Sequence, residues 1–282
     1  MNDNFQLVEL NKSEFERNIF LYKNTNTKLG DSVMKLLDEC QKPLTRDSIK
    51  YIAMFTMLLN HIADIFLHTG TWICEIFIAV GYFTAISMIY FLVEGYDYTH
   101  SKKKYFFRLI IFGLISEIPY CLALTSEGII SFYGLNMMFT LSLCFGLIWI
   151  MDNMKSTLIK VMLSIIIIGL SIFCSWALLA PIYTLLFIWA KRSQKRKKIA
   201  FVISALLFGF IGYLGGIEHF TTSENILYSL LSMIGMGLAG FCILYLYNGK
   251  QAVKGKKFSK WFFYVFYPAH LLILGIIRIS IM

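Results

Sequence analysis

Nine apolar segments follow one another along this chain, and each is close to the length of a membrane-crossing helix. They lie at residues 49–68, 72–94, 105–124, 135–151, 158–174, 176–190, 198–217, 226–247 and 260–281. A helix needs about 20 apolar residues to cross the hydrocarbon core of a bilayer. With 57% hydrophobic and 15% charged residues, the chain is too apolar for a soluble domain. The sequence therefore predicts an all-α, polytopic transmembrane helix bundle.

The distribution of basic residues sets the expected topology. Lys and Arg lie between the segments at residues 102–104, 155, 191–198 and 250–257, whereas loops 69–71, 125–134 and 218–225 contain none. Basic loops face the cytoplasm in multi-pass proteins. Nine spans, with the N-terminus cytoplasmic and the C-terminus outside, satisfy every loop. Fusing the short fifth and sixth segments would place a basic loop outside.

Residues 1–46 differ from the rest, because acids, bases, Asn and Thr are mixed there. They lack the basic start and uninterrupted apolar core of a signal peptide. We expect a cytoplasmic N-terminal extension, with residues 32–41 on the membrane surface. Residues 47–282 form the expected transmembrane domain of a multi-pass protein of the cell membrane.

The net charge of +9 is explained by these basic loops, which suit an anionic inner leaflet. Membrane lipid is therefore an expected partner and nucleic acid is not. The six cysteines form no CxxC pair and follow no metal-ligand spacing, so no metal site is expected. Neither HExxH nor GxSxG occurs, which disfavours a zinc protease or a serine hydrolase.

The first apolar segment carries three ionisable residues, Lys50, His61 and Asp64. Each costs about 3 kcal/mol at the centre of a bilayer on insertion scales, so such residues usually mark a functional site. Eleven residues make three helical turns, which places Lys50 and His61 on one face about 16 Å apart. Asp64 can accept a hydrogen bond from His61 and fix its tautomer. Alternatively, Lys50 extends to the interface and the other two form a structural helix contact.

Further polar residues fall into two layers under this topology. The inner layer contains Lys50, Glu94, Lys103 and Arg108, and the outer layer contains His61, Asp64, Glu117, Asn136 and His270. Each also has a structural interpretation. Glu94 is an interfacial carboxylate at a helix end, Asn136 a helix cap and His270 a packed core residue.

Four stretches resemble the TraX family, which is associated with acetylation of the amino terminus of F-pilin. They are IAMFTMLLNHIADIF, FLVEGYDYTHSKKKYFFRLIIFGLISEIPY, LNMMFTLSLCFGL and FYVFYPAHLLIL. The family is similar to the acyltransferase type 3 membrane enzymes, in which a basic residue, ten intervening residues and a catalytic His mark the first helix. Lys50 and His61 have that spacing, with Lys in place of the usual Arg. Asn60 stands where those enzymes often have Asp, which leaves open whether Asp64 supplies the carboxylate.

The resemblance implies an acetyltransferase that uses cytoplasmic acetyl-CoA. Its expected donor site is Lys50, Glu94, Lys103 and Arg108. His61 would be the general base or transient acyl carrier, and Asp64 or Glu117 would orient it. Substrate would contact Asn60, Asn136 and His270, with Asn136 able to donate to the oxyanion.

The acceptor remains open between the amine of a peptide or pilin-like N-terminus and a hydroxyl of a glycan or lipid. A transporter, or a membrane assembly protein without enzymatic activity, is the alternative function. The absence of internal sequence repeats disfavours the transporter.

Overall fold

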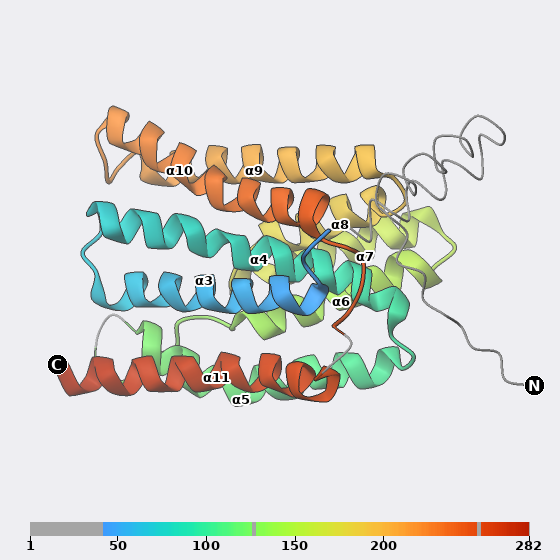
Figure 1. Cartoon of the computed structure of the whole chain (residues 1–282), viewed down its shortest axis with the longest axis horizontal. Helices are drawn as coiled ribbons and strands as arrows, with labels where there is room; N and C mark the ends of the chain where they lie inside the picture. The colour runs from blue at the N-terminus through green and yellow to red at the C-terminus, as the bar shows by residue number, and fades with distance from the viewer. Residues whose placement is uncertain (1–41, 126–127, 253–254, 282) are drawn as a thin grey trace, which may run out of the picture.

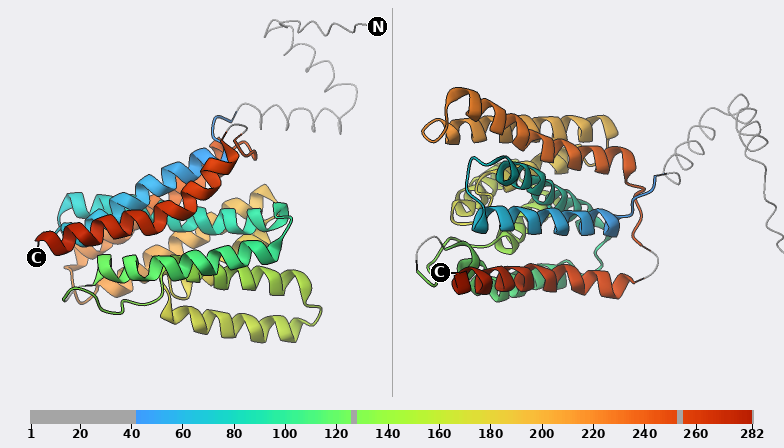
Figure 2. Two further views of the ribbon diagram at one scale, coloured as in Figure 1. Left: turned by 90° about the horizontal axis from the view of Figure 1, so that it is seen from below. Right: turned by 60° about the vertical axis from the view of Figure 1, so that its left-hand side comes forward.

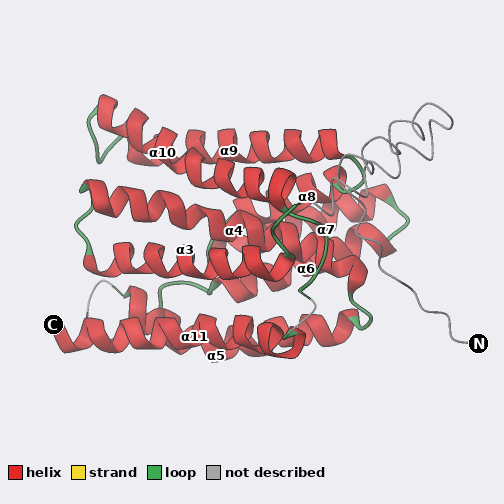
Figure 3. Ribbon diagram, in the orientation of Figure 1, coloured by secondary structure: helices red, strands yellow, loops and turns green. Residues whose placement is uncertain are grey.

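A computed structural model describes residues 42–125, 128–252 and 255–281 of the chain. Within these ranges the regular elements are all helices, and no strand is formed (Figure 3). The predicted all-α fold is therefore confirmed for this part of the chain. Residues 1–41, which hold most of the predicted N-terminal extension and its surface segment, lie outside the described residues.

Six helices are long and apolar enough to cross a membrane. They are α3 (Arg46–Phe66), α4 (Trp72–Tyr98), α5 (Lys102–Leu124), α9 (Gln194–Gly216), α10 (Thr222–Phe241), which a π-helical turn at Cys242–Leu246 extends, and α11 (Lys256–Ile281). The apolar helices α6 (Met137–Asn153), α7 (Thr157–Leu170) and α8 (Leu179–Ala190) are shorter. The protein is thus a multi-pass membrane protein, and the nine-span topology stays a prediction for α6, α7 and α8.

The long helices pack in pairs that lie side by side along the molecule (Figure 1). The pair of α3 and α4 lies between the pair of α9 and α10 and the pair of α5 and α11, and the turned views agree (Figure 2). Direct contacts join α4 to α10 and α11 to α3. The central pair is therefore held from both sides.

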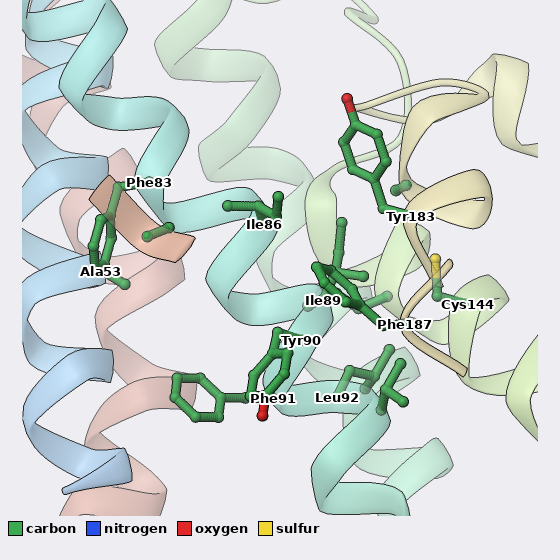
Figure 4. Packing of buried hydrophobic residues seen from close by; sticks show 14 of the residues in the cluster. Ala53, Phe83, Ile86, Ile89, Tyr90, Phe91, Leu92, Cys144, Tyr183 and Phe187 are labelled. Carbon is green, nitrogen blue, oxygen red and sulfur yellow. The ribbon is translucent and has the colours of Figure 1, made fainter. Parts of the chain in front are cut away.

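Helix α4 forms the centre of the bundle. In the most apolar 18-residue stretch of this helix, 67% of the residues are buried inside the protein. It is apolar on nearly every side, and such a helix is stable only where neighbours surround it. Ile86 and Ile89 belong to the buried core together with Tyr183 and Phe187 of α8 (Figure 4). Because the middle of α4 is surrounded, its polar residues Thr84 and Ser87 are buried against other helices.

The two ends of the bundle differ in charge. The loops that follow α4, α6 and α8, and the connection between α10 and α11, lie at one end, on the right of Figure 1. The sequence carries most of its Lys and Arg in or beside these connections, so we call this the basic end. The loop between α3 and α4 and the C-terminus of α11 lie at the opposite end. The arrangement groups the basic loops as the predicted topology requires.

Backbone hydrogen bonds at the basic end fix the start of α3 to the connection between α10 and α11. The amide of Leu44 donates to the Leu246 carbonyl at 3.0 Å, and the amide of Arg46 donates to the Lys250 carbonyl at 2.9 Å. The carboxylate of Asp47 accepts from the Ala252 amide at 3.1 Å. The first turn of α3 therefore has a defined position beside this connection.

Two loops pair inside the bundle between the shorter helices. The Leu135 amide donates to the Phe173 carbonyl, and the Ser175 amide donates to the Leu135 carbonyl, both at 2.8 Å. Trp176 and Leu178 in the same loop have φ angles of 59° and 61°, which non-glycine residues rarely adopt. This strained turn is held between the start of α6 and the start of α8.

Candidate functional site: a cavity along α3

A cavity of about 720 Å³ extends along one face of α3. The α3 residues that line it are Arg46, Asp47, Lys50, Met54, Met57, Asn60, His61 and Asp64. Most of them recur at spacings of three or four, which places them in one stripe on a helix. From Arg46 to Asp64 the stripe covers about 27 Å of helix. The cavity therefore joins the basic end to the outer part of the bundle, and Lys50 and His61 line it together as their spacing predicts.

Three cationic side chains line the cavity where it begins at the basic end. The Lys50 ammonium lies 5.2 Å from the ring centre of Phe263, and the Arg108 guanidinium lies 5.5 Å from that of Tyr105. The Nε atoms of Arg46 and Arg108 are buried and have no hydrogen-bond partner among the described residues. A buried donor without a partner costs about 1 to 3 kcal/mol. Both guanidinium groups are therefore suited to an anionic ligand.

Arg46 is a site residue that the sequence interpretation missed. It precedes Lys50 by four residues, so its position on the same helical face was the available signal. Its Nε lies 3.8 Å from a carboxylate oxygen of Glu94, which also accepts a hydrogen bond of 2.8 Å from the Tyr247 hydroxyl. Glu94 does not line the main cavity in the described part of the chain. It borders a separate cavity of about 120 Å³ and positions Arg46.

Three lysines at the start of α11 also line the cavity, namely Lys256, Lys257 and Lys260. The sequence interpretation gave the first two a role in topology alone. By contrast, Lys103 is exposed and is not among the described residues that line the cavity. Its neighbour Lys102 forms an ion pair of 3.0 Å with Asp152. The cationic lining therefore comes from α3, Arg108 and α11 rather than from the cluster at residues 102–104.

His61 lies deeper in the cavity and contacts His270 of α11. The two ring centres are 5.3 Å apart and the rings are stacked with an angle of 28° between them. His270 is 5% exposed, and it is not among the described residues that line the cavity. The structure thus brings together two histidines that are 209 positions apart in the sequence (270 − 61).

Asp64 lines the cavity one turn beyond His61. Within the described residues no hydrogen bond joins its carboxylate to His61 or to any other group. Tyr82 and Trp176 line the same part of the cavity, with their ring centres 5.9 Å apart. The outer part of the cavity therefore combines an accessible carboxylate with aromatic surface, a combination that binds organic cations.

Glu117 and Asn136 form a network outside the cavity lining. The Asn136 side-chain amide donates to Glu117 at 2.6 Å and to the Gly113 carbonyl at 2.7 Å, and its oxygen accepts from the Met138 amide at 2.9 Å. Asn136 is fully buried and is the N-cap of α6. The side-chain oxygen and nitrogen of Asn136 are thus both engaged within the protein, and Glu117 joins α5 to the start of α6.

Asn60 lines the cavity and fills the space over Gly81 of α4. A Cβ atom built at Gly81 would lie 2.3 Å from the Asn60 Cβ, so the absence of a side chain permits this close approach of α3 and α4. The Asn60 amide also lies 3.5 Å from the Ile78 carbonyl. Asn60 therefore helps to fix the turn of α3 that carries His61.

The charges along the cavity are arranged with one sign at each end. Six cationic side chains line its basic part, where the one carboxylate, Asp47, is occupied by the Ala252 amide. Asp64 is the other carboxylate among the described lining residues. Such a space can bind a polyanion at the basic end and a neutral or cationic group at the other end. Between them the imidazole of His61 provides a nitrogen base.

Comparison with known proteins extends these observations. The family model described as "TraX protein" matches residues 45–278, which include every described residue that lines the cavity. The chain is also 28% identical over 237 residues to a "Probable fimbrial assembly protein FimC, serogroup H1" from Dichelobacter nodosus. That match covers 80% of this chain and 92% of the relative. No solved structure matches the chain.

Proposed function

We propose that this chain, which belongs to the TraX family, is a membrane-embedded acetyltransferase that takes its acetyl group from acetyl-CoA. One observation carries the proposal: a single cavity joins six cationic side chains to His61. In the bacterial inner or cytoplasmic membrane, the basic end would face the cytoplasm, where acetyl-CoA is made. The family membership supports the same reaction.

The basic end fits the phosphate groups of coenzyme A. Guanidinium groups bind phosphate oxygens through paired hydrogen bonds, and lysines contribute charge. The buried Nε of Arg108, which has no hydrogen-bond partner among the described residues, would then obtain an acceptor, and Arg46 would add its charge beside its ion pair with Glu94. Lys50 lies between this end and His61 on the cavity wall, so the thioester would extend along α3 toward the imidazole.

His61 would act as the general base. The acceptor nitrogen or oxygen attacks the thioester carbonyl carbon, and its proton passes to His61. The carbon–sulfur bond then breaks, and the proton returns to the departing thiolate. General-base assistance contributes about 10² to 10⁴ in rate. Transient acetylation of His61 itself would give the same products in two steps.

The acceptor would occupy the outer part of the cavity beside Asp64. A carboxylate flanked by Tyr82 and Trp176 suits an ammonium group before it loses its proton to become the nucleophile. The name of the relative from Dichelobacter nodosus refers to fimbrial assembly. Together these points favour the amino terminus of a pilin-like peptide over a glycan hydroxyl as acceptor.

Transfer of labelled acetyl groups from acetyl-CoA to candidate acceptors tests the proposal. We expect purified protein in detergent to label a membrane-inserted pilin-like peptide at its free amino terminus, and His61→Gln to abolish the labelling. Asp64→Asn should raise KM for the peptide if it binds the ammonium, and lower kcat instead if it orients His61. Folded wild-type protein that labels neither peptide nor glycan would favour a transport or assembly role.

A further inference from the structure

His270 holds a fixed position behind His61. Its Nδ1 lies 2.8 Å from the Phe266 carbonyl oxygen, four residues earlier in α11. Its ring also stacks on Phe266, with ring centres 4.8 Å apart and an angle of 15°. These two contacts leave the imidazole little freedom. His270 is therefore a rigid neighbour for the more accessible His61.

The hydrogen bond to Phe266 assigns the proton on His270. A carbonyl oxygen can only accept a hydrogen bond, so Nδ1 must carry the hydrogen. In the neutral ring Nε2 is then an acceptor. This Nε2 atom is buried and has no hydrogen-bond partner among the described residues. His270 thus presents an unused acceptor inside the bundle.

His61 has the complementary requirement. Its Nδ1 is likewise buried without a partner in the described part of the chain. A base that accepts a proton at Nε2 must carry hydrogen on Nδ1 beforehand. Once both nitrogens are protonated the ring is positively charged, and a buried charge is costly unless it is hydrogen-bonded. An acceptor for Nδ1–H is what such a base needs.

We propose that His270 is a positioning residue that accepts the Nδ1–H of His61 through its own Nε2. It holds His61 in the tautomer with Nε2 free for the acceptor, and it stabilises the imidazolium that forms when Nε2 takes up the proton. The proton taken up at Nε2 then passes to the departing thiolate, while the Nδ1 proton stays between the two rings, so no further reactant is required. This inference rests on the proposed acetyltransferase function of the same cavity.

The stacked arrangement defines the motion that this role requires. With the rings nearly parallel, the two nitrogens do not point at each other in plane. One ring must turn about its Cβ–Cγ bond to form the hydrogen bond. His270 is held by Phe266, whereas His61 borders the cavity and has space to turn.

Variants at His270 separate positioning from packing. His270→Phe keeps an aromatic ring against Phe266 without an acceptor, and His270→Gln retains an amide oxygen near the place of Nε2. We expect the Phe variant to lose about 100-fold or more in kcat with KM for acetyl-CoA unchanged, and the Gln variant to lose less than about 10-fold. His270→Met replaces the Phe variant if that one does not fold. The exposed His219→Phe is the matched control and should match wild type.

Nitrogen-15 NMR of histidine-labelled protein gives a readout that does not depend on activity. We expect His61 to carry hydrogen on Nδ1 in wild type and in His270→Gln, and to show both tautomers in His270→Phe. A folded Phe variant with kcat within about threefold of wild type overturns the proposal, because general-base positioning is worth far more. Equal losses in both variants with unchanged His61 signals would also overturn it. If wild type lacks transferase activity, the proposed function fails. The tautomer measurement would still show whether His61 donates its Nδ1–H to His270.

Discussion

Arg46 and Arg108 reach the basic end of the cavity from different helices, and each has a buried Nε without a hydrogen-bond partner in the described residues. They differ in what else they contact. Arg46 lies 3.8 Å from the Glu94 carboxylate, whereas Arg108 lies over the rings of Tyr105 and Tyr264. Removing Arg46 leaves Glu94 without its cationic partner, so Arg108 gives the cleaner test of donor binding.

We expect Arg108→Gln to raise KM for acetyl-CoA by about 10- to 100-fold while kcat changes little. A hydrogen bond to a charged group contributes about 1.5 to 3 kcal/mol, and the phosphates are remote from the reacting carbon. Steady-state kinetics over a range of acetyl-CoA concentrations measures both constants. Lys155→Ala, an exposed basic residue in the loop between α6 and α7, serves as the control and should leave KM unchanged. An unaltered KM in Arg108→Gln would remove this residue from the donor site.

At the scale of the elements, the contact between α4 and α10 depends on a glycine. A Cβ atom at Gly235 would lie 1.9 Å from the Ala79 carbonyl oxygen, so any side chain there would force the two helices apart. Gly237, two residues later in α10, has no atom within 4 Å of its Cβ position. A substitution at Gly235 therefore tests the close packing of α10 on α4, whereas the same substitution at Gly237 changes only the helix propensity of the residue.

Gly235→Ala should destabilise the protein by about 1 to 3 kcal/mol, the usual range for overpacking. Gly237→Ala should leave stability unchanged or raise it by about 0.5 to 1 kcal/mol, because alanine favours helix over glycine. Thermal unfolding of both variants in the same detergent measures the difference. Equal melting temperatures for the two variants would mean that α10 does not pack on α4 as described.

The sequence predicted some of these features because they depend on one helix alone. The spacing of Lys50 and His61 places both on one face of α3, and the cavity follows that face. Features that depend on two helices could not be predicted. The sequence placed His270 in the same layer as His61 but could not show that α11 brings the two rings into contact. It also could not show that Lys260 lines the cavity whereas Lys103 does not. Asn136 shows the same limit, because its partner Glu117 lies on another helix.

At the scale of the whole molecule, the helix directions constrain the topology that was predicted from charge. After α3, α4 and α5 the chain has reached the end of the bundle opposite the basic loops, whereas α9 begins at the basic end (Figure 1). The shorter helices α6, α7 and α8 must therefore return the chain across the bundle. An odd number of crossings does this, as nine spans require. The cavity would then begin on the side of the membrane that carries most of the Lys and Arg residues.

The central claim is that this cavity brings acetyl-CoA to His61, and release of free coenzyme A by the purified protein tests it most directly. We predict that wild type releases coenzyme A from acetyl-CoA when acceptor is supplied, that His61→Gln loses this activity by at least about 100-fold, and that His219→Gln retains it. All three proteins must give the same unfolding profile. Equal release by wild type and a folded His61→Gln would contradict the account, as would a folded wild type that neither binds nor consumes acetyl-CoA.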